Sequence, residues 1–433
     1  MPKLRLALAA FVAVILSALL GTFLLPASNA SPPRSASTAT VGLDRGNWAP
    51  HNYDLISKLI ANNSSTANPD RAAAPYAVFD WDNTSIINDV TDKLFLYQMD
   101  TLRYALTPKE FAADLASTVP PGRLAESVTN LAGKRLTREQ LNADIVSDYR
   151  YLYNNYKGLN GSKSLAAIHK TPQFKDFKAK LYFLFDAIIT THGKEIAYPW
   201  ETFFFDNLTP KQFQDLARDS IRHQMQIAIA DVTLTSPAQL EGKAGQVEIS
   251  YTDGMRTVPE IWNLMHTFLA NGIDVFVVSA GFEPLVEAIA SDPAFGYNVP
   301  ADKVFGLRLE QDRKGRYEPV YKKGWPFTYG PGKPQLVRQE IYPKHQNRQP
   351  IFVAGDSGSD LGNFTEFDDT QLLLIVNYLP TGDLGKLAKI AADTRTSPNA
   401  RYLLQGVDEY IGLWRPSEKS LMLGATKPQL LAS

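Results

Sequence analysis

Three apolar stretches of the sequence are predicted to be buried strands, and each runs directly into polar side chains. They are YAVF (76–79) before Asp80, VFVV (275–278) before Ser279, and IFVA (351–354) before Gly355 and Asp356. Stretches of helical periodicity separate the strands, such as PEIWNLMHTFLANG (259–272), with proline in its first turn and glycine at its end. Apolar strands that alternate with helices favour an α/β fold with a parallel, doubly wound sheet.

Further segments continue the same pattern. They are helices at 51–61, 283–291 and 333–342, strands at 247–251 and 370–377, and a hairpin over 304–321 around Lys314 and Gly315. The spacing of these segments predicts a core domain made of residues 51–88 and 246–415. Residues 416–433 are assigned to a C-terminal tail.

Residues 89–245 form a long polar and aromatic block that interrupts this core after its first strand. The stronger helical patterns in the block lie at 109–116, 137–157, 173–190 and 209–229. Because the block separates one strand from all the others, we predict a helical cap domain inserted into the core.

The first 30 residues have the pattern of a targeting segment. Lys3 and Arg5 precede an apolar run from Leu6 to Leu25, and Ser28-Asn29-Ala30 offers a small-x-small cleavage site. We predict a cleaved signal peptide at 1–30, a proline-rich linker at 31–50, and export to the periplasm or the cell exterior. After cleavage no stable membrane span is expected. The apolar run is nearly long enough to cross a bilayer, so an uncleaved N-terminal anchor is the alternative.

Composition limits the partners and cofactors of the chain. Its 433 residues carry a formal net charge of −1, which gives no basis for binding nucleic acid. There is no cysteine, which excludes disulfides and cofactors held by thiolate. The expected partner is therefore a small molecule.

Two carboxylates, Asp80 and Asp82, follow the first strand two residues apart, and Thr84 follows at the same spacing. Residues i and i+2 of an extended chain point the same way, so both carboxylates are expected side by side. This pairing suits phosphoryl transfer through a covalent aspartyl phosphate. Asp80 is the predicted nucleophile. Asp82 is the predicted acid that protonates the leaving oxygen and then the base that activates water.

Other polar side chains at the same edge of the predicted sheet complete such a site. Carboxylates that share a pocket with a phosphate dianion need a cation, and oxygen ligands without histidine or cysteine point to Mg²⁺. The predicted metal ligands are Asp80, the backbone carbonyl of Asp82, and Asp356. Asp360 is expected either to ligate the ion directly or to hold a water molecule bound to it. The residues predicted to bind the phosphoryl oxygens, where charge develops in the transition state, are Thr84, Ser279 and Lys333.

These residues resemble the four motifs of the haloacid dehalogenase (HAD) superfamily in order and spacing. The matching stretches are Asp80-x-Asp82-x-Thr84, the strand-ending Ser279, Lys333 within GPGKP (330–334), and GDSGSD (355–360). The resemblance implies a Rossmann-like core, Mg²⁺ as cofactor and, because an aspartate occupies position 82, the phosphatase branch of the superfamily. The long insertion after the first motif resembles a C1-type cap.

Stretches beyond the motifs resemble secreted bacterial phosphorylcholine phosphatases, and Ser279 with the GF after it resembles phosphoserine phosphatase. The former stretches are YPW (198–200), NGIDVFVVSA (271–280) and DPAFGYNV (292–299). This resemblance implies a phosphomonoesterase that acts on a small zwitterionic ester such as phosphocholine. The alternatives are phosphoserine or a broad acid-phosphatase range. A protein that binds a choline-type ligand without turnover would be expected to lack Asp80 or Asp82.

Three residues are candidates for contact with the alcohol half of the substrate. The phosphorylcholine phosphatase group has a glutamate-rich stretch after the first motif, whereas here residues 88–93 read NDVTDK. A quaternary ammonium is bound by aromatic faces with an anion nearby. The candidates are Asp92, Tyr198 and Trp200, and YPWE (198–201) is the stretch favoured to face the substrate. The other cap aromatics are expected to pack in the interior of the cap.

Overall fold

The structure is a computed structural model that describes residues 40–69 and 72–432. One compact unit spans Thr40–Ser433. The predicted signal peptide (1–30) and residues 31–39 of the predicted linker lie outside the described residues. Within the described ranges, no helix combines the length and the apolar character needed to cross a bilayer.

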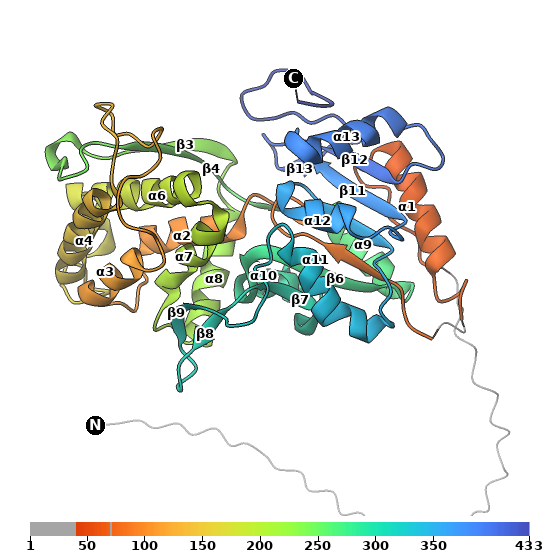
Figure 1. Ribbon diagram of the computed structural model, residues 1–433, viewed down its shortest axis with the longest axis horizontal. Coiled ribbons are helices and arrows are strands. Elements are labelled where there is room, and N and C mark those ends of the chain that lie inside the picture. The colour runs from red at the N-terminus through yellow and green to blue at the C-terminus, as the bar shows by residue number, and fades with distance from the viewer. Residues whose placement is uncertain (1–39, 70–71, 433) are drawn as a thin grey trace, which may run out of the picture. The chain divides into compact units, whose positions relative to one another are not determined.

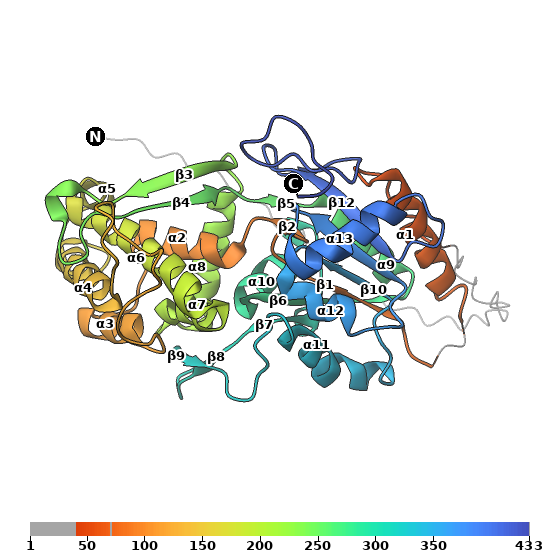
Figure 2. The same cartoon turned by 45° about the horizontal axis from the view of Figure 1, so that its top comes forward.

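A seven-stranded sheet forms the centre of the core domain, in the order β13-β12-β11-β10-β1-β6-β7. Its strands are β1 (Tyr76–Phe79), β6 (Asp274–Phe282), β7 (Val304–Leu307), β10 (Phe352–Gly355), β11 (Leu372–Asn377), β12 (Tyr402–Asp408) and β13 (Leu413–Trp414). All neighbours pair parallel except β12 and β13. The predicted parallel sheet is confirmed (Figure 1). β1 lies inside it between β10 and β6, and Figure 2 labels these three strands.

Helices cover both faces of this sheet (Figure 2). They are α1 (Pro50–Asn63), α9 (Pro259–Ala270), α10 (Glu283–Ala290), α11 (Gly332–Leu336), α12 (Leu361–Thr365) and α13 (Gly382–Thr394). Successive residues of a strand point to opposite faces. Ala77 and Phe79 of β1 therefore pack in one apolar core with α1, α9 and α10. Tyr76 and Val78 pack in a second core with α11, α12 and α13, which confirms the doubly wound arrangement.

The cap domain is inserted between β2 (Ile86–Ile87) and β5 (Arg256–Thr257). Its helices are α2 (Val90–Thr101), α3 (Pro108–Ala116), α4 (Arg138–Asn155), α5 (Leu165–His169), α6 (Pro172–His192), α7 (Lys194–Thr202) and α8 (Pro210–Gln224). Threonine side chains accept a backbone N–H at the starts of α3, α4, α6 and α8. These caps explain why the four predicted cap helices begin where the sequence pattern places them.

The predicted strand at 247–251 is present as β4 (Glu248–Asp253), but it does not join the central sheet. It pairs antiparallel with β3 (Ala230–Thr235) and packs against α6 of the cap. An alternating pattern identifies a strand but not its pairing partner. The inserted block therefore extends to Asp253, beyond the predicted boundary at 245.

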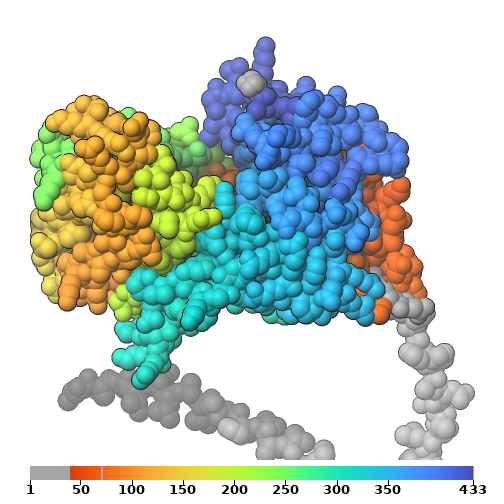
Figure 3. Space-filling model, viewed as in Figure 1, coloured from red at the N-terminus to blue at the C-terminus, as the bar shows by residue number. Residues whose placement is uncertain are grey.

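A hairpin of the core domain reaches the cap. Its strands β8 (Leu309–Gln311) and β9 (Tyr317–Tyr321) pair around the predicted turn, where Gly315 has a φ of +74°. The first residues of the predicted hairpin form β7 instead. The Asn207 N–H donates to the Tyr317 carbonyl (3.0 Å), and the Tyr317 N–H donates to the Leu208 carbonyl (3.0 Å). Figure 3 shows this cyan segment alongside the cap.

Both ends of the described chain pack against the core. Trp48, within the predicted linker, is fully buried and contacts Trp414 edge to face, with ring centroids 5.0 Å apart. The described part of that segment is therefore packed rather than an open linker. In the tail, the Leu421 N–H donates to the Val407 carbonyl of β12 (2.8 Å), and Ser420 is buried.

Candidate active site

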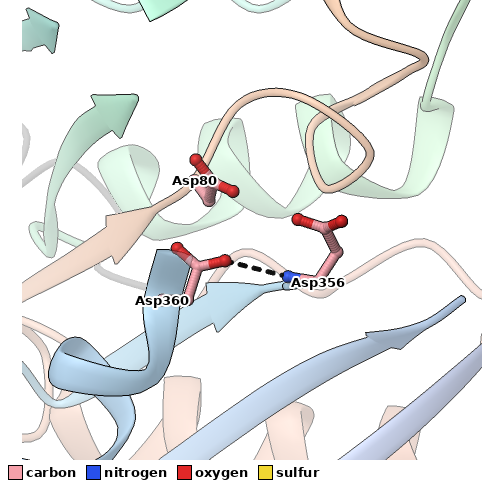
Figure 4. Close-up of side chains that lie close together, drawn as sticks. All are labelled: Asp80, Asp356 and Asp360. Atoms are coloured by element: carbon pink, nitrogen blue, oxygen red, sulfur yellow. Dashed lines mark hydrogen bonds between the residues drawn. The ribbon is translucent and has the colours of Figure 1, made fainter. Parts of the chain in front are cut away.

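The sheet brings three carboxylates together at the carboxyl ends of its strands. Asp80 follows β1 and Asp356 follows the neighbouring β10, and the Asp80 N–H donates to the Ala354 carbonyl across that pair (2.9 Å). Asp360 ends the short helical turn after β10. One carboxylate oxygen from each of Asp80, Asp356 and Asp360 lies within 4.8 Å of the other two, and all three residues are buried (Figure 4).

Lys333, in the first turn of α11, adds one positive charge to this group. Its Nζ lies 2.5 Å from Oδ1 of Asp80 and 2.6 Å from Oδ1 of Asp360, and the side chain is fully buried. Burial lowers the pKa of Lys333, but the carboxylates of Asp360 and Asp80 outweigh that effect and hold the pKa raised. The side chain is therefore an ammonium that links two of the three carboxylates.

The charges in this group are unbalanced. Burial, followed by the Asp360 carboxylate, raises the pKa of Asp80 to about 7, although Lys333 opposes the rise. Burial and the carboxylates of Asp80 and Asp360 raise the pKa of Asp356 well above its usual value. Because three carboxylates share one ammonium, a divalent cation that prefers oxygen ligands fits this set of side chains.

Asp82 lies beside a space next to β6. Its Oδ1 accepts the Val90 N–H at the start of α2 (2.8 Å). A Cβ added to Gly281 would stand 3.3 Å from Asp82 Oδ2. The same point is 3.2 Å from Ser279 Oγ and 2.9 Å from Thr91 Oγ1, so three polar atoms surround one position that glycine leaves open. Asp82 and Ser279 are predicted site residues. Thr91 and Gly281 are not, and no strand end marks Thr91 in the sequence.

Hydrogen bonds hold the remaining motif side chains at the same edge. Thr84 is fully buried, and its Oγ1 lies 3.5 Å from Oδ1 of Asp356. Ser279 Oγ accepts the Gly281 N–H (2.9 Å). Asp360 Oδ2 accepts the Asp356 N–H (3.1 Å), which fixes the carboxylate that also contacts the lysine. The structure thus places all seven motif residues at one edge of the sheet.

A profile of the haloacid dehalogenase-like hydrolases matches residues 182–363 of the chain. This stretch contains Ser279, Lys333, Asp356 and Asp360, which the fold brings to the end of β1. The chain carries a haloacid dehalogenase-like hydrolase domain. The family indicated by the sequence motifs is therefore confirmed.

Two relatives of this hydrolase extend the comparison. The phosphorylcholine phosphatase of Pseudomonas aeruginosa is 27% identical over 184 residues, which cover 37% of this chain and 49% of that protein. The chain thus spans about half the length of this curated relative. The crystal structure of a conserved, functionally unknown protein from Anaerococcus prevotii is 31% identical, with a TM-score of 0.81, and covers 88% of this chain and 98% of that one. The hydrolase domain and its cap therefore share the fold of a solved structure.

Of the predicted substrate contacts, Tyr198 lies where the cap meets the hydrolase domain, and Asp92 lies on α2 and bonds to cap residues. Asp92 Oδ2 accepts hydrogen bonds from Lys93 Nζ (2.9 Å) and Tyr182 Oη (3.2 Å). Its Oδ1 is buried without a hydrogen-bond partner. Tyr198 of α7 contacts Tyr329, in the loop before α11, edge to face with ring centroids 5.9 Å apart.

Trp200, the third predicted substrate contact, lies inside the cap instead. It is fully buried, and its Nε1 donates to the Leu115 carbonyl (3.1 Å). Its ring packs edge to face on Phe204, with centroids 5.1 Å apart. The sequence YPWE does not show which side of α7 faces the cap interior. In the structure the indole of Trp200 packs among apolar residues of the cap, so the predicted substrate contact is wrong.

Glu201 directly follows Trp200 and is the last residue of the stretch YPWE (198–201), which we predict to face the substrate. Its side chain is buried, and its Oε1 has no hydrogen-bond partner. Burial, with the carboxylates of Asp89 and Asp92, raises the pKa of Glu201 well above its usual value, and Asp82 contributes to the same rise.

Proposed function

We propose that the protein is a Mg²⁺-dependent phosphomonoesterase that forms an aspartyl phosphate on Asp80. One observation carries the proposal: the Asp80 carboxylate lies within 4.8 Å of Asp356 and Asp360 and 2.5 Å from Lys333. The proposed nucleophile Asp80 thus lies near two carboxylates suited to bind a metal ion, and next to an ammonium, that of Lys333, suited to bind phosphoryl oxygens. The hydrolase domain and the named phosphatase relative support this chemistry.

The acidic group fits Mg²⁺. Within the described residues, Asp80, Asp356 and Asp360 offer only carboxylate oxygens to an ion, and they carry more negative charge than Lys333 balances. The backbone carbonyl of Asp82 is a further proposed ligand. When bound, Mg²⁺ would neutralise charge on the transferring phosphoryl group.

In the first step, an Asp80 oxygen forms a bond to phosphorus while the bond from phosphorus to the alcohol oxygen breaks. Asp82 donates a proton to that departing oxygen. The Val90 N–H holds Asp82 Oδ1 (2.8 Å), which leaves Oδ2 for the proton. Lys333, Thr84 and Ser279 bind phosphoryl oxygens.

In the second step, water hydrolyses the aspartyl phosphate. Asp82, now a carboxylate, takes a proton from the water molecule. The water oxygen bonds to phosphorus, and the bond from phosphorus to Asp80 breaks. Inorganic phosphate leaves, and both aspartates return to their starting protonation states.

Hydrolysis of p-nitrophenyl phosphate with and without Mg²⁺ tests the proposal. We expect activity only with the ion, and we expect Asp80→Asn to lower kcat by at least about a thousandfold without unfolding the protein. Asp302→Asn, at an exposed position, is the matched control and should retain activity. Near-normal turnover by Asp80→Asn would contradict the covalent mechanism.

The proposed substrate is a small zwitterionic phosphate monoester. Phosphocholine is the first candidate, because the relative from Pseudomonas aeruginosa is a phosphorylcholine phosphatase. O-phosphoserine, or a broad acid-phosphatase range, is the alternative, and kcat/KM for a panel of monoesters separates them. A binding protein without turnover is the weaker candidate, because Asp80 and Asp82 are both present.

Export to the periplasm or the cell exterior belongs to the proposed function. The charged start, apolar run and cleavage site within residues 1–30 support it. Expression of the full chain, cell fractionation and N-terminal sequencing test it, with Ser31 expected as the first residue of the exported form. An intact N-terminus in the membrane fraction would favour the uncleaved anchor.

A further inference from the structure

Three side-chain oxygen atoms converge beside Gly281, near the end of β6. Apart from its chain neighbours, a Cβ built on Gly281 would have these three oxygens as its nearest atoms. They are Thr91 Oγ1 at 2.9 Å, Ser279 Oγ at 3.2 Å and Asp82 Oδ2 at 3.3 Å. Glycine has no Cβ, so no side chain at position 281 separates them. Of the three residues, Thr91 alone has no part in the mechanism described above.

Thr91 belongs to the first turn of the cap helix α2, and hydrogen bonds fix it against the core. The side chain is buried, and its Oγ1 accepts the Phe282 N–H of β6 (3.3 Å). Its backbone N–H donates to Oδ1 of Asp89, the residue that caps the helix (2.9 Å). The hydroxyl is therefore held at a defined position between the cap and the strand that carries Ser279.

The hydroxyl hydrogens of Thr91 and Ser279 are both available for donation. A hydroxyl has one hydrogen to donate and lone pairs that accept. Both oxygens already accept, Thr91 from the Phe282 N–H and Ser279 from the Gly281 N–H (2.9 Å). Within residues 40–69 and 72–432, neither hydroxyl donates to an acceptor of the chain. The three residues thus offer two O–H donors and one carboxyl oxygen to an atom from outside the chain.

The atom that suits these three groups is the oxygen on the alcohol side of phosphorus. Ser279 is proposed to bind a phosphoryl oxygen, and Asp82 is proposed to protonate the leaving oxygen through Oδ2. A place that both side chains face therefore lies beside the bond that breaks. Negative charge develops on the departing oxygen in the transition state, and an O–H donor held at a fixed position stabilises that charge.

We infer that Thr91 is a further catalytic residue, whose hydroxyl donates a hydrogen bond first to the leaving alcohol oxygen and then to the water that hydrolyses the aspartyl phosphate. This inference rests on the proposed phosphomonoesterase activity. Asp82 still supplies and recovers the proton that moves, and Thr91 keeps its own. In the second step the hydroxyl holds the water where the alcohol oxygen was, so that Asp82 can take its proton. The cap thus contributes a group to the chemistry itself.

Rapid mixing of Thr91→Val with p-nitrophenyl phosphate and Mg²⁺ tests the two steps separately. Valine keeps the shape of threonine and lacks the hydroxyl. p-Nitrophenolate is a weak base, so its departure needs little help from a donor, whereas the attack of water needs that water to be held in place. We expect a burst of about one p-nitrophenolate per chain, followed by a steady rate at least about tenfold below that of the wild type.

Two further variants separate the hydroxyl from the fold. Thr91→Ser keeps the hydroxyl, so its steady rate should stay within about threefold of the wild-type rate. Thr101→Val is the matched control at the other end of α2, where the threonine hydroxyl donates to the Tyr97 carbonyl (2.7 Å). We expect this control to show the burst and the steady rate of the wild type.

A fall of the steady rate in Thr91→Val without a burst would show a structural role and overturn the assignment. An unchanged steady rate, or a loss in Thr91→Ser as large as in Thr91→Val, would overturn it too. If Thr91→Val does not fold, Thr91→Ala, which leaves room for a water molecule at the Phe282 N–H, is measured in the same way. Wild-type protein that does not hydrolyse p-nitrophenyl phosphate at all would overturn the proposed function, and the role of Thr91 with it.

Discussion

Gly355 shows how the lack of one side chain allows the acidic group to form. A Cβ at this position would stand 2.4 Å from Cγ of Asp360, far inside van der Waals contact. Asp360 needs that space, because there it accepts the Asp356 N–H (3.1 Å) and pairs with Lys333 (2.6 Å). Glycine is therefore needed at position 355 so that the Asp360 carboxylate can approach the backbone closely, and not because the backbone adopts a special conformation there.

Gly355→Ala is predicted to displace Asp360 and weaken the proposed metal site. The added methyl group forces the carboxylate to move, so Mg²⁺ affinity should fall at least about tenfold and the free energy of unfolding by about 1–3 kcal/mol. Isothermal titration with Mg²⁺ and urea unfolding measure the two effects. Gly358→Ala is the control, because a Cβ there meets nothing within 4 Å. Equal effects in both variants would refute this account of Gly355.

Three of the predicted site residues directly follow the ends of predicted strands. Asp80, Ser279 and Asp356 follow apolar runs, and parallel neighbours bring such positions to one edge. On a helix, the sequence marks a stretch such as YPWE (198–201) but does not show which of its side chains face inward, because that depends on packing. The prediction that Trp200 contacts substrate was wrong for the same reason. The sequence does not distinguish an aromatic residue that lines a site from one that packs in a core.

The hairpin β8–β9 connects the cap to the strand that carries Ser279. Tyr317 of β9 is 5% exposed, and its ring lies 5.7 Å from that of Phe213 in the cap and 5.3 Å from that of Phe282 at the end of β6. The backbone of Tyr317 also exchanges two hydrogen bonds with the cap segment at Asn207 and Leu208. One hairpin residue thus joins both domains.

Tyr317→Ala is predicted to loosen the cap. Truncation of a buried aromatic side chain should lower the free energy of unfolding by about 3–5 kcal/mol. Because the lost contacts support the cap, hydrogen exchange at the Asn207 amide should rise more than exchange in β1. Val320→Ala on the same strand is the control, since Val320 is 52% exposed. Unchanged exchange at Asn207 would show that the cap does not depend on this residue.

For helices and strands, local sequence signals predicted which elements form better than they predicted which elements pair or pack together. The long cap helices were predictable because periodicity and threonine caps agree. α7 was not predicted, because Pro199 interrupts its helical pattern. β4 was recognisable as a strand, but its pairing with β3 depends on the cap that surrounds it. The sheet order likewise follows from packing between segments far apart in the chain.

The cap interior contains a second unbalanced group of charges, which affects the stability of the whole molecule. Lys180 is fully buried and pairs with Asp144 (3.0 Å) and Asp176 (2.9 Å). Burial, together with the neighbouring Asp176, raises the pKa of Asp148 to about 9. An aspartate in the unfolded chain has a pKa of about 3.9. The folded chain therefore binds more protons than the unfolded chain between these two values.

The free energy of unfolding is therefore predicted to fall as pH rises between these two pKa values. Asp148→Asn should remove the part of this pH dependence that comes from ionisation of Asp148. Asparagine cannot ionise, so the stability advantage of the variant over wild type should grow with pH, by up to about 1.4 kcal/mol per pH unit. Urea unfolding at several pH values from about 6 to about 8 measures this difference. The exposed control Asp302→Asn should follow wild type. A pH-independent difference would exclude ionisation of Asp148 as the cause.

The proposed metal site depends on the folded molecule, because Asp80 and Lys333 are 253 positions apart in the chain. An unfolded chain cannot hold Asp80, Asp356 and Asp360 within 4.8 Å of one another. An ion that binds only the native state stabilises it by mass action, by about 2.7 kcal/mol at a concentration 100 times the Kd. Mg²⁺ should therefore raise the melting temperature of the wild-type protein in a saturable way.

Asp356→Asn separates metal binding from folding. The variant loses one proposed ligand, so its melting temperature should no longer rise with Mg²⁺. Without Mg²⁺ it should melt at or above the wild-type temperature, because one of three crowded, buried carboxylates is gone. Asp302→Asn should respond to Mg²⁺ as wild type does. A full Mg²⁺ response in Asp356→Asn would place the ion elsewhere. A large loss of stability without the ion would mean that Asp356 holds the fold together rather than a metal.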